Sequence, residues 1–233
     1  MKKITDGIYW VEGLLVGRVY VIESADGLTV IDATIPNAVK RIAQEIASIG
    51  HSLTDVKRIL ITHAHPDHIG SLAALQQATN AAVYVHPNDV GPVRGENIPM
   101  PVPASLTGLA RVLGSLMPPT KMAAATVQRE IREGDVLDEV LPGLTVLEVF
   151  GHSPGQVAFW YPAKHLLFCG DVAMHLLGMR LPMAVATVNM AQAKQSIQRI
   201  AALDTDIVCF GHGDPIIGGA AAALRTFAAK VAP

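Results

Sequence analysis

One short segment of the chain carries histidine and aspartate at a spacing that suits metal binding. It consists of His63, His65, Asp67 and His68 in the run HAHPDH. Residues 63 and 65 project the same way from an extended backbone, whereas 67 and 68 can turn toward a neighbouring ion. A single loop can therefore supply ligands to two metal ions.

Three further residues can join that loop. His152, Asp171 and His212 each follow an apolar, strand-like run and lie beside glycine, in GHSPGQ, FCGDV and CFGHGD. Glycine permits close backbone approach, so such side chains can meet in space. Taken singly, His152 and His212 would more often be ordinary loop histidines, and HAHPDH could be a solvated loop. The coincidence of all four sites instead predicts a metal centre.

The expected chemistry follows from the ligand types. Neutral imidazole and carboxylate bind borderline divalent metals, and three ligands per ion leave a coordination position for solvent. Two cations lower the pKa of a water that bridges them toward ~7, which supplies hydroxide as a nucleophile at neutral pH. Asp67, besides acting as a ligand, could pass the proton to the leaving group. No serine or cysteine nucleophile is required.

Composition excludes several classes of function. The 233 residues are 50% apolar, and 18 Lys and Arg nearly balance 20 Asp and Glu, so neither nucleic acid nor an anionic membrane is expected as a partner. The first residues lack a secretory signal, and apolar runs are interrupted before the ~20 residues that span a bilayer. A cytoplasmic protein without a transmembrane helix is expected. Cys169 and Cys209 lie in apolar runs and are expected to be buried, without a disulfide.

The pattern of apolar residues predicts strands alternating with helices. Strand pieces are expected between 8 and 34, and further strands at 56–62, 82–85, 145–150, 157–161, 165–169 and 207–210. Helices are expected at 37–50, from His68 through Gln77, and at 190–203. This order, roughly repeated in the two halves, predicts sheets covered by helices within a single domain, 1–233.

A segment rich in proline and glycine, approximately 87–126, interrupts this order and is interpreted as a lid-like insertion. Within it, Ser105 to Met117 places leucines and methionine along one helical face. Such a stretch could cover the metals or belong to the core, and the sequence does not distinguish the two.

The order of these motifs resembles that of the metallo-β-lactamase superfamily, particularly its glyoxalase II-like and lactonase-like hydrolases. The motifs are, in chain order, Asp32 in TVIDAT, then THAHPDH, GHSPG, CGD and GHG. The resemblance extends from Ile8 to His212. It implies an αββα four-layer sandwich with two divalent metal ions at one edge of the sheets, zinc first, with iron or manganese as alternatives. It also implies that Asp32 supports a ligand histidine. Aspartate at 171, where zinc β-lactamases often have cysteine, argues against an antibiotic-degrading enzyme.

The same resemblance distributes the ligands. One ion is expected to be held by His63, His65 and His152 and the other by Asp67, His68 and His212, with Asp171 bridging them.

Several functions stay open at this point. The first is metal-dependent hydrolysis of an ester, lactone or thioester. The second is a mononuclear iron persulfide dioxygenase, which would use His63, His152 and Asp171 and leave the second site unused. A metal-binding or nuclease-like protein is disfavoured because no basic groove is evident.

A preference among acyl substrates is also expected. Only 21 residues follow His212, so the helical domain with which glyoxalase II holds glutathione is expected to be absent. The segment from Pro99 to Pro119 is apolar, and Arg111 and Lys121 are the nearby cations. We therefore expect a small, uncharged or weakly anionic acyl substrate with an apolar part to be preferred over a glutathione thioester.

Overall fold

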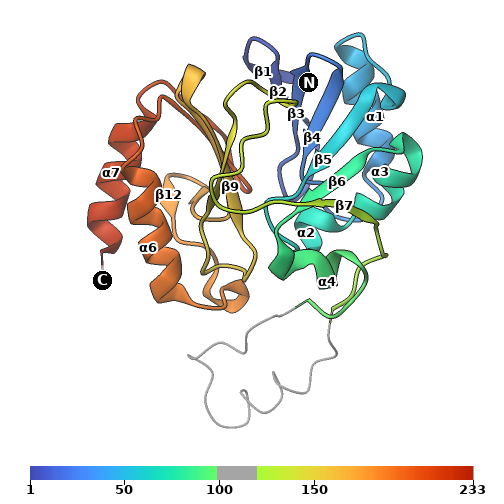
Figure 1. Cartoon of the computed structure of the whole chain (residues 1–233). Coiled ribbons are helices and arrows are strands. Elements are labelled where there is room, and N and C mark those ends of the chain that lie inside the picture. The colour runs from blue at the N-terminus through green and yellow to red at the C-terminus, as the bar shows by residue number, and fades with distance from the viewer. Residues whose placement is uncertain (99–119, 233) are drawn as a thin grey trace.

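The computed structural model describes residues 1–98 and 120–232. Two β-sheets face each other, and helices cover the outer face of each sheet (Figure 1). The expected four-layer αββα sandwich is therefore confirmed. Within the described ranges, no helix has the length and apolar character required to cross a membrane.

The first sheet has seven strands that pair in chain order. β1 to β4 are antiparallel neighbours, whereas β4 to β7 are parallel. The strands are β1 (Lys2–Thr5), β2 (Ile8–Trp10), β3 (Tyr20–Ser24), β4 (Gly27–Ile31), β5 (Val56–Leu60), β6 (Ala82–Val85) and β7 (Val127–Glu130).

The second sheet has five strands in the order β14-β13-β10-β9-β8, and β8, β10 and β13 run in one direction. Its strands are β8 (Thr145–Glu148), β9 (Val157–Tyr161), β10 (Leu166–Gly170), β13 (Ile207–Phe210) and β14 (Ile216–Ile217). A small hairpin, β11 (Met174–His175) and β12 (Met179–Arg180), follows β10.

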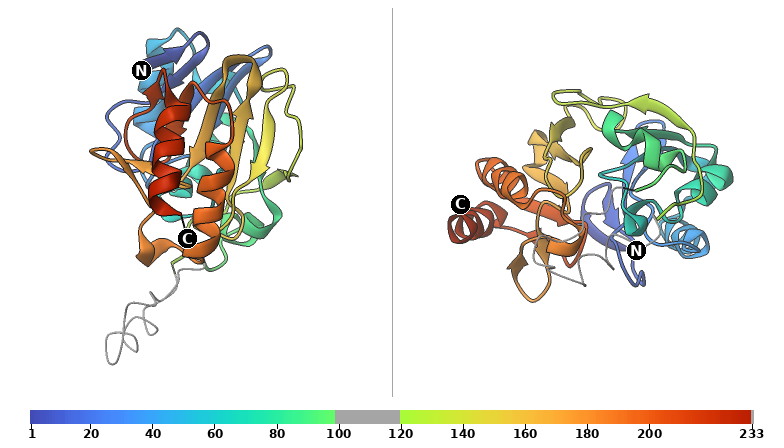
Figure 2. Two further views of the ribbon diagram at one scale, coloured as in Figure 1. Left: turned by 90° about the vertical axis from the view of Figure 1, so that its left-hand side faces the viewer. Right: turned by 90° about the horizontal axis from the view of Figure 1, so that it is seen from below.

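Helices α1 and α3 lie on the first sheet, and α6 and α7 lie side by side on the second, as Figure 2 shows from two directions. The helices are α1 (Val39–Ser48), α2 (Pro66–Ile69), α3 (Leu72–Thr79), α4 (Val90–Val93), α6 (Met190–Ala201) and α7 (Ala220–Val231). Short 3-10 turns are η1 (Leu53–Asp55), η2 (Pro87–Asp89), η3 (Pro162–Lys164) and η4 (Ala184–Ala186).

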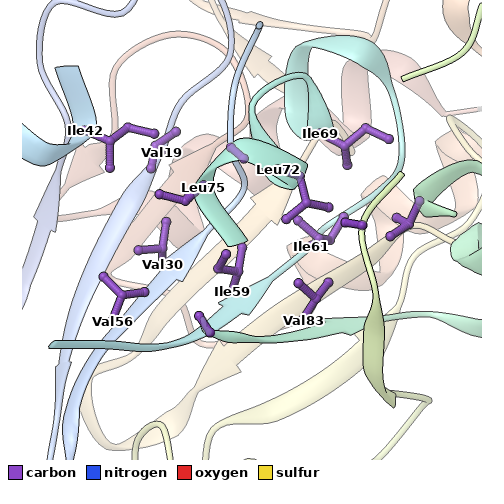
Figure 3. Packing of buried hydrophobic residues seen from close by; sticks show 14 of the residues in the cluster. Val19, Val30, Ile42, Val56, Ile59, Ile61, Ile69, Leu72, Leu75 and Val83 are labelled. Carbon is purple, nitrogen blue, oxygen red and sulfur yellow. The ribbon is translucent and has the colours of Figure 1, made fainter. Parts of the chain in front are cut away.

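Three clusters of buried apolar side chains fill the spaces between the layers. Ile42 and Leu75 belong to the cluster between the first sheet and its helices (Figure 3). Phe168 packs between the sheets, and its neighbour Leu167 packs under α6 and α7. Because β10 is buried on both faces, all of its residues, LLFCG, are apolar or glycine. Cys169 and Cys209 are free and buried, as expected.

The helix expected from His68 through Gln77 is in fact two helices, α2 and α3, and that prediction is wrong in this respect. Ser71 separates them: its hydroxyl donates to the Ile35 carbonyl at 2.6 Å and accepts from the Ala38 backbone N–H at 2.9 Å. A Cβ on Gly70 would lie 2.5 Å from the ring of Pro36. The break thus lets residues 35–38 pack against the start of α3.

The segment 87–126 is described only at its two ends. Val90, Val93, Ile98 and Ala125 belong to the buried cluster beneath the first sheet's helices. These ends are therefore anchored in the core. The stretch from Ser105 to Met117, for which a helical face is expected, lies outside the described residues.

A buried tyrosine ties the two sheets together. Tyr20 of β3 donates its hydroxyl hydrogen to the backbone carbonyl of Phe210 in β13 at 2.7 Å, and its ring packs edge-on against Phe168 at 5.3 Å. This bond anchors the strand end that precedes His212.

We expect Tyr20→Phe to lower the free energy of unfolding of the metal-free protein by about 1–3 kcal/mol, because the Phe210 carbonyl is left unpaired in the interior. Urea titration measures this change. Tyr161→Phe serves as the control, since Tyr161 is only partly buried, and should change stability by less than about 0.5 kcal/mol. Equal effects of the two substitutions would contradict the proposed tie.

Candidate metal centre

Strand direction brings the candidate ligands to one end of the sandwich. In the first sheet, Asp32 follows β4 and His63 comes three residues after β5. In the second sheet, His152, Asp171 and His212 follow the three strands that run in one direction, β8, β10 and β13. Helix α2, at the lower end of the sheets in Figure 1, carries Asp67 and His68.

All seven predicted side chains come together there. His63, His65 and His152 form one group in which the possible ligand atoms lie within 4.8 Å of one another, and Asp67, His68 and His212 form a second. A third group, within the same limit, joins His63 and His68 to Asp171. The two expected ligand sets therefore exist as compact clusters.

Asp171 lies between the two clusters. Its Oδ2 is 3.4 Å from Nε2 of His152 and 3.2 Å from Nε2 of His212. Its Oδ1 is 3.4 Å from Nε2 of His68. One buried carboxylate thus contacts members of both clusters, as a bridging ligand must.

The donor atoms fit divalent ions. Nε2 of His63, Nε2 of His68 and Oδ1 of Asp171 are buried and have no hydrogen-bond partner among the described residues. Leaving such a group unpaired costs about 1–3 kcal/mol. His65 Nδ1 and His152 Nε2 are 2.9 Å apart, and two nitrogens on one tetrahedral zinc ion are about 3.3 Å apart. An ion held by His63, His65 and His152 would pair with Nε2 of His63 and separate these two nitrogens, and an ion in the second cluster would pair with Nε2 of His68.

A hydrogen-bond network behind the clusters fixes two of the histidines. The Asp32 carboxylate accepts three hydrogen bonds: from Nδ1 of His68 at 2.8 Å, from the backbone N–H of Thr62 at 2.8 Å and from the Thr62 hydroxyl at 2.7 Å. The Thr62 hydroxyl oxygen is then free to accept from Nδ1 of His63, 3.1 Å away. Both Nδ1 atoms are thereby engaged, so each ring directs its Nε2 into the site.

His152 is oriented in the same manner by a different element. Thr187 donates its hydroxyl hydrogen to the Met183 carbonyl at 2.8 Å, so its oxygen accepts from Nδ1 of His152 at 3.1 Å. The Nε2 of His152 is thereby directed toward Asp171. Three ligand histidines thus each have a partner that sets their tautomer.

The pKa values of the histidines differ between the two clusters. Burial lowers the pKa of His63 and His152, and that of His65 to about 3, so these rings are neutral at pH 7. Burial also lowers the pKa of His68 and His212, but the neighbouring carboxylates outweigh it. Asp171 and Asp32 raise the pKa of His68, and Asp171 and Asp67 raise that of His212 to about 9.

The carboxylates keep their charge. Burial alone would raise the pKa of Asp67, but the hydrogen bond from His212 and the charge of His68 lower it to about 2. The pKa of Asp171 also lies well below its usual range, because His68 and His212 outweigh burial. The site therefore favours positive charge.

A hollow of about 370 Å³ opens onto this centre at Asp67 and His212. Its walls are mainly apolar and come from two segments: Leu14, Leu15 and Val16 on one, and Met174, Leu176 and Met183 on the other. A larger hollow of about 580 Å³ lies between β12 and α7, but no candidate ligand lines it. The smaller hollow is the one beside reactive groups.

Other histidines have structural partners. His175 donates its backbone N–H to the His212 carbonyl at 3.0 Å, and its Nδ1 lies 2.8 Å from the Asp214 carbonyl. His86 lies 3.1 Å from Glu148. Sequence reasoning missed Thr62, Thr187 and Asp89 as supporting residues; Thr62 directly precedes His63, whereas the other two carry no local signal.

Comparison with known proteins agrees with this geometry. A family model described as the metallo-beta-lactamase superfamily matches residues 13–212. A probable metallo-hydrolase of Bacillus subtilis is 28% identical over 229 residues, covering 89% of this chain and 85% of the relative. A hydroxyacylglutathione hydrolase of Cereibacter sphaeroides is 33% identical over 156 residues, covering 66% of this chain and 48% of that enzyme.

Solved structures show the same fold. A metallo-beta-lactamase family protein of Thermus thermophilus has a TM-score of 0.74 at 19% identity, covering 98% of this chain and 80% of its own. A subclass B3 metallo-beta-lactamase of Bradyrhizobium japonicum has a TM-score of 0.71 at 25% identity, covering 98% and 89%.

We expect about two transition-metal ions per chain, because both three-ligand clusters are complete and Asp171 contacts each of them. Elemental analysis of protein purified without chelator and then reconstituted measures this ratio. The variant His51→Ala, at a partly exposed histidine distant in sequence from every ligand, should bind the same amount. One tightly bound ion or fewer in the parent protein would overturn the prediction.

Proposed function

The chain belongs to the metallo-beta-lactamase superfamily of metal-dependent hydrolases, and from that premise we propose that it is a dinuclear metallohydrolase acting on an ester, a lactone or a thioester. The observation that carries the proposal is the position of Asp171 between two complete ligand clusters. A mononuclear iron dioxygenase would use His63, His152 and Asp171 and leave the second site unused. The completeness of the Asp67, His68 and His212 cluster therefore favours the hydrolase.

Two divalent ions would supply Lewis acidity for a carbonyl oxygen and would lower the pKa of water toward ~7. The protein's own residues prepare the site for this chemistry. Asp32, Thr62 and Thr187 direct imidazole Nε2 atoms inward, so little reorganisation is needed when the site is loaded.

Asp67 is the proposed proton carrier. Its side chain is 26% exposed, against 5% for Asp171, and it lines the apolar hollow. Its pKa of about 2 keeps Asp67 ionised at neutral pH, as a proton acceptor must be. Asp67 would take up a proton of the attacking water as the water oxygen bonds to the acyl carbon, and would return that proton to the departing alcohol or thiol as the acyl C–O or C–S bond breaks.

The hollow beside Asp67 indicates the substrate's character. Its walls offer leucine, valine and methionine side chains, and Leu15, Leu176 and Met183 are 90%, 47% and 54% exposed. An apolar group placed there removes such surface from water, which contributes about 25 cal/mol per Å². We therefore propose an acyl compound whose non-reacting part is apolar.

Among the described lysine and arginine side chains, the one that lines the hollow is already engaged by protein groups. Arg18 lines the hollow, but its Nε donates to the Gly213 carbonyl and its Nη2 donates to Asp214, both at 2.9 Å. A charged tripeptide such as glutathione would need unengaged partners. The hydroxyacylglutathione hydrolases among the relatives leave a thioester within the proposed class, and this chain spans about half of their length.

Replacing the bridging residue tests the assignment of ligands. We expect Asp171→Ala to lower kcat/KM at least about 100-fold, because one carboxylate serves both clusters. Far-ultraviolet circular dichroism should be preserved, since Asp171 lies beyond the end of β10. Asp138→Ala, at an exposed aspartate, is the control and should keep full activity. A fully active Asp171→Ala protein would refute the ligand assignment.

A substrate panel tests the acyl preference. We expect kcat/KM to be higher for a medium-chain lactone or an aryl ester than for S-lactoylglutathione or a β-lactam, all measured at identical metal loading. Preference for the glutathione thioester would contradict the role given to the apolar hollow. Turnover of a persulfide with consumption of oxygen would instead identify the dioxygenase.

Neighbouring leucines provide a matched pair of variants for the hollow. Leu176 lines it, whereas Leu177 is fully exposed and does not. We expect Leu176→Ala to lower kcat/KM for the medium-chain lactone about 3- to 10-fold, because part of a leucine's apolar burial is lost. Leu177→Ala should have no effect on that value. Equal effects would show that the wall is not a substrate contact.

A further inference from the structure

A buried carboxylate outside the candidate ligands contacts two of the loops that carry them. Asp89 is the last residue of η2, directly before α4, and is 2% exposed. Within the described residues it forms no ion pair with lysine or arginine. Its partners are instead backbone and hydroxyl groups of the two loops.

The first loop lies between two candidate ligands. Oδ2 of Asp89 accepts the backbone N–H of Ala64 at 2.8 Å, and Ala64 separates His63 from His65. The second loop follows His152. The Ser153 hydroxyl donates to Oδ2 of Asp89 at 3.4 Å, and the backbone N–H of Gly155 lowers the pKa of the same carboxyl group.

Glycine at 155 permits this close approach. A Cβ there would lie 2.5 Å from Cγ and from Oδ1 of Asp89. Burial raises the pKa of Asp89 to about 6, which still leaves the group mainly ionised at neutral pH. An ionised carboxylate offers acceptors only, and bonds from N–H groups to it are stronger than those to a neutral acceptor.

We propose that Asp89 is a positioning residue that holds the loop of His63 and His65 at a fixed distance from the loop of His152, and thereby sets the affinity of that cluster for its ion. The inference rests on the proposed metal centre. It concerns one cluster only, because the other depends on different contacts. Asp32 holds His68, and Arg18 and Tyr20 hold the segment 210–213 that carries His212.

The test uses two backgrounds that each keep a single cluster. His212→Ala retains His63, His65 and His152, and His152→Ala retains the other cluster. Asp89→Asn is introduced into each background. The amide has nearly the same volume, but it must turn a donor toward one of the two N–H groups.

Zinc dissociation constants are measured by competition with a chromophoric chelator. In the His212→Ala background, Asp89→Asn should weaken binding about 10- to 100-fold, the range found for residues that orient metal ligands. In the His152→Ala background the change should be under threefold. Equal weakening in both backgrounds, or none in either, overturns the proposal.

Amide hydrogen exchange in the metal-free protein gives an independent measurement. Asp89→Asn should speed exchange at the amide of Ala64 or Gly155 and leave exchange at Ile59, in the core of β5, unchanged. Unchanged exchange at both Ala64 and Gly155 would overturn the proposal that Asp89 positions the two loops. Gly155→Ala, whose added methyl group would collide with Asp89, should weaken zinc binding in the His212→Ala background. A parent protein that binds no zinc would refute the metal centre itself, and with it the role of Asp89, whatever the exchange result.

Discussion

Seven ionisable side chains share one small, largely buried volume between the ends of two sheets, and most of the local structure serves that arrangement. Desolvation disfavours the charged forms of carboxylates and imidazoles alike. In this protein, Asp171 stays ionised because histidines surround it, and the Nε2 atoms of His63 and His68 are buried without a hydrogen-bond partner among the described residues. Divalent cations at the two clusters would offset the buried negative charge of Asp171 and pair with these Nε2 atoms. The burial of Asp171 among imidazoles is thus the interaction that would make metal binding energetically favourable.

Support for the ligands comes from elements that are far apart in the sequence. Asp32 directly follows strand β4 of the first sheet, Thr187 belongs to a loop before α6, and Asp89 ends the turn after β6. Each accepts hydrogen bonds from a ligand ring or from the loop beside one. Thr187 also donates to the carbonyl of Met183, whose side chain lines the apolar hollow. One loop thus contacts both a candidate ligand and the wall of the hollow. The layered packing of three apolar clusters holds these elements in place.

Much of this could be predicted from the sequence, for physical reasons. Strands buried on both faces leave continuous apolar runs, and ligands placed directly after them stand out, so all seven candidate ligands were identifiable before their positions were known. Other features carry no such signal. Helix α7 begins with four alanines and shows little polar and apolar contrast, and the break between α2 and α3 depends on the tertiary contacts of Ser71. Thr187 and Asp89 act through partners 35 and 25 residues away, which no local pattern can reveal.

The central claim is that two ions share Asp171. Its most direct test is anomalous diffraction from crystals of the zinc-reconstituted protein, recorded on both sides of the zinc absorption edge. The account predicts two peaks about 3.5–4 Å apart, one beside His63, His65 and His152, the other beside Asp67, His68 and His212, with Asp171 reaching both. A single peak, or two peaks of which Asp171 contacts only one, would contradict it.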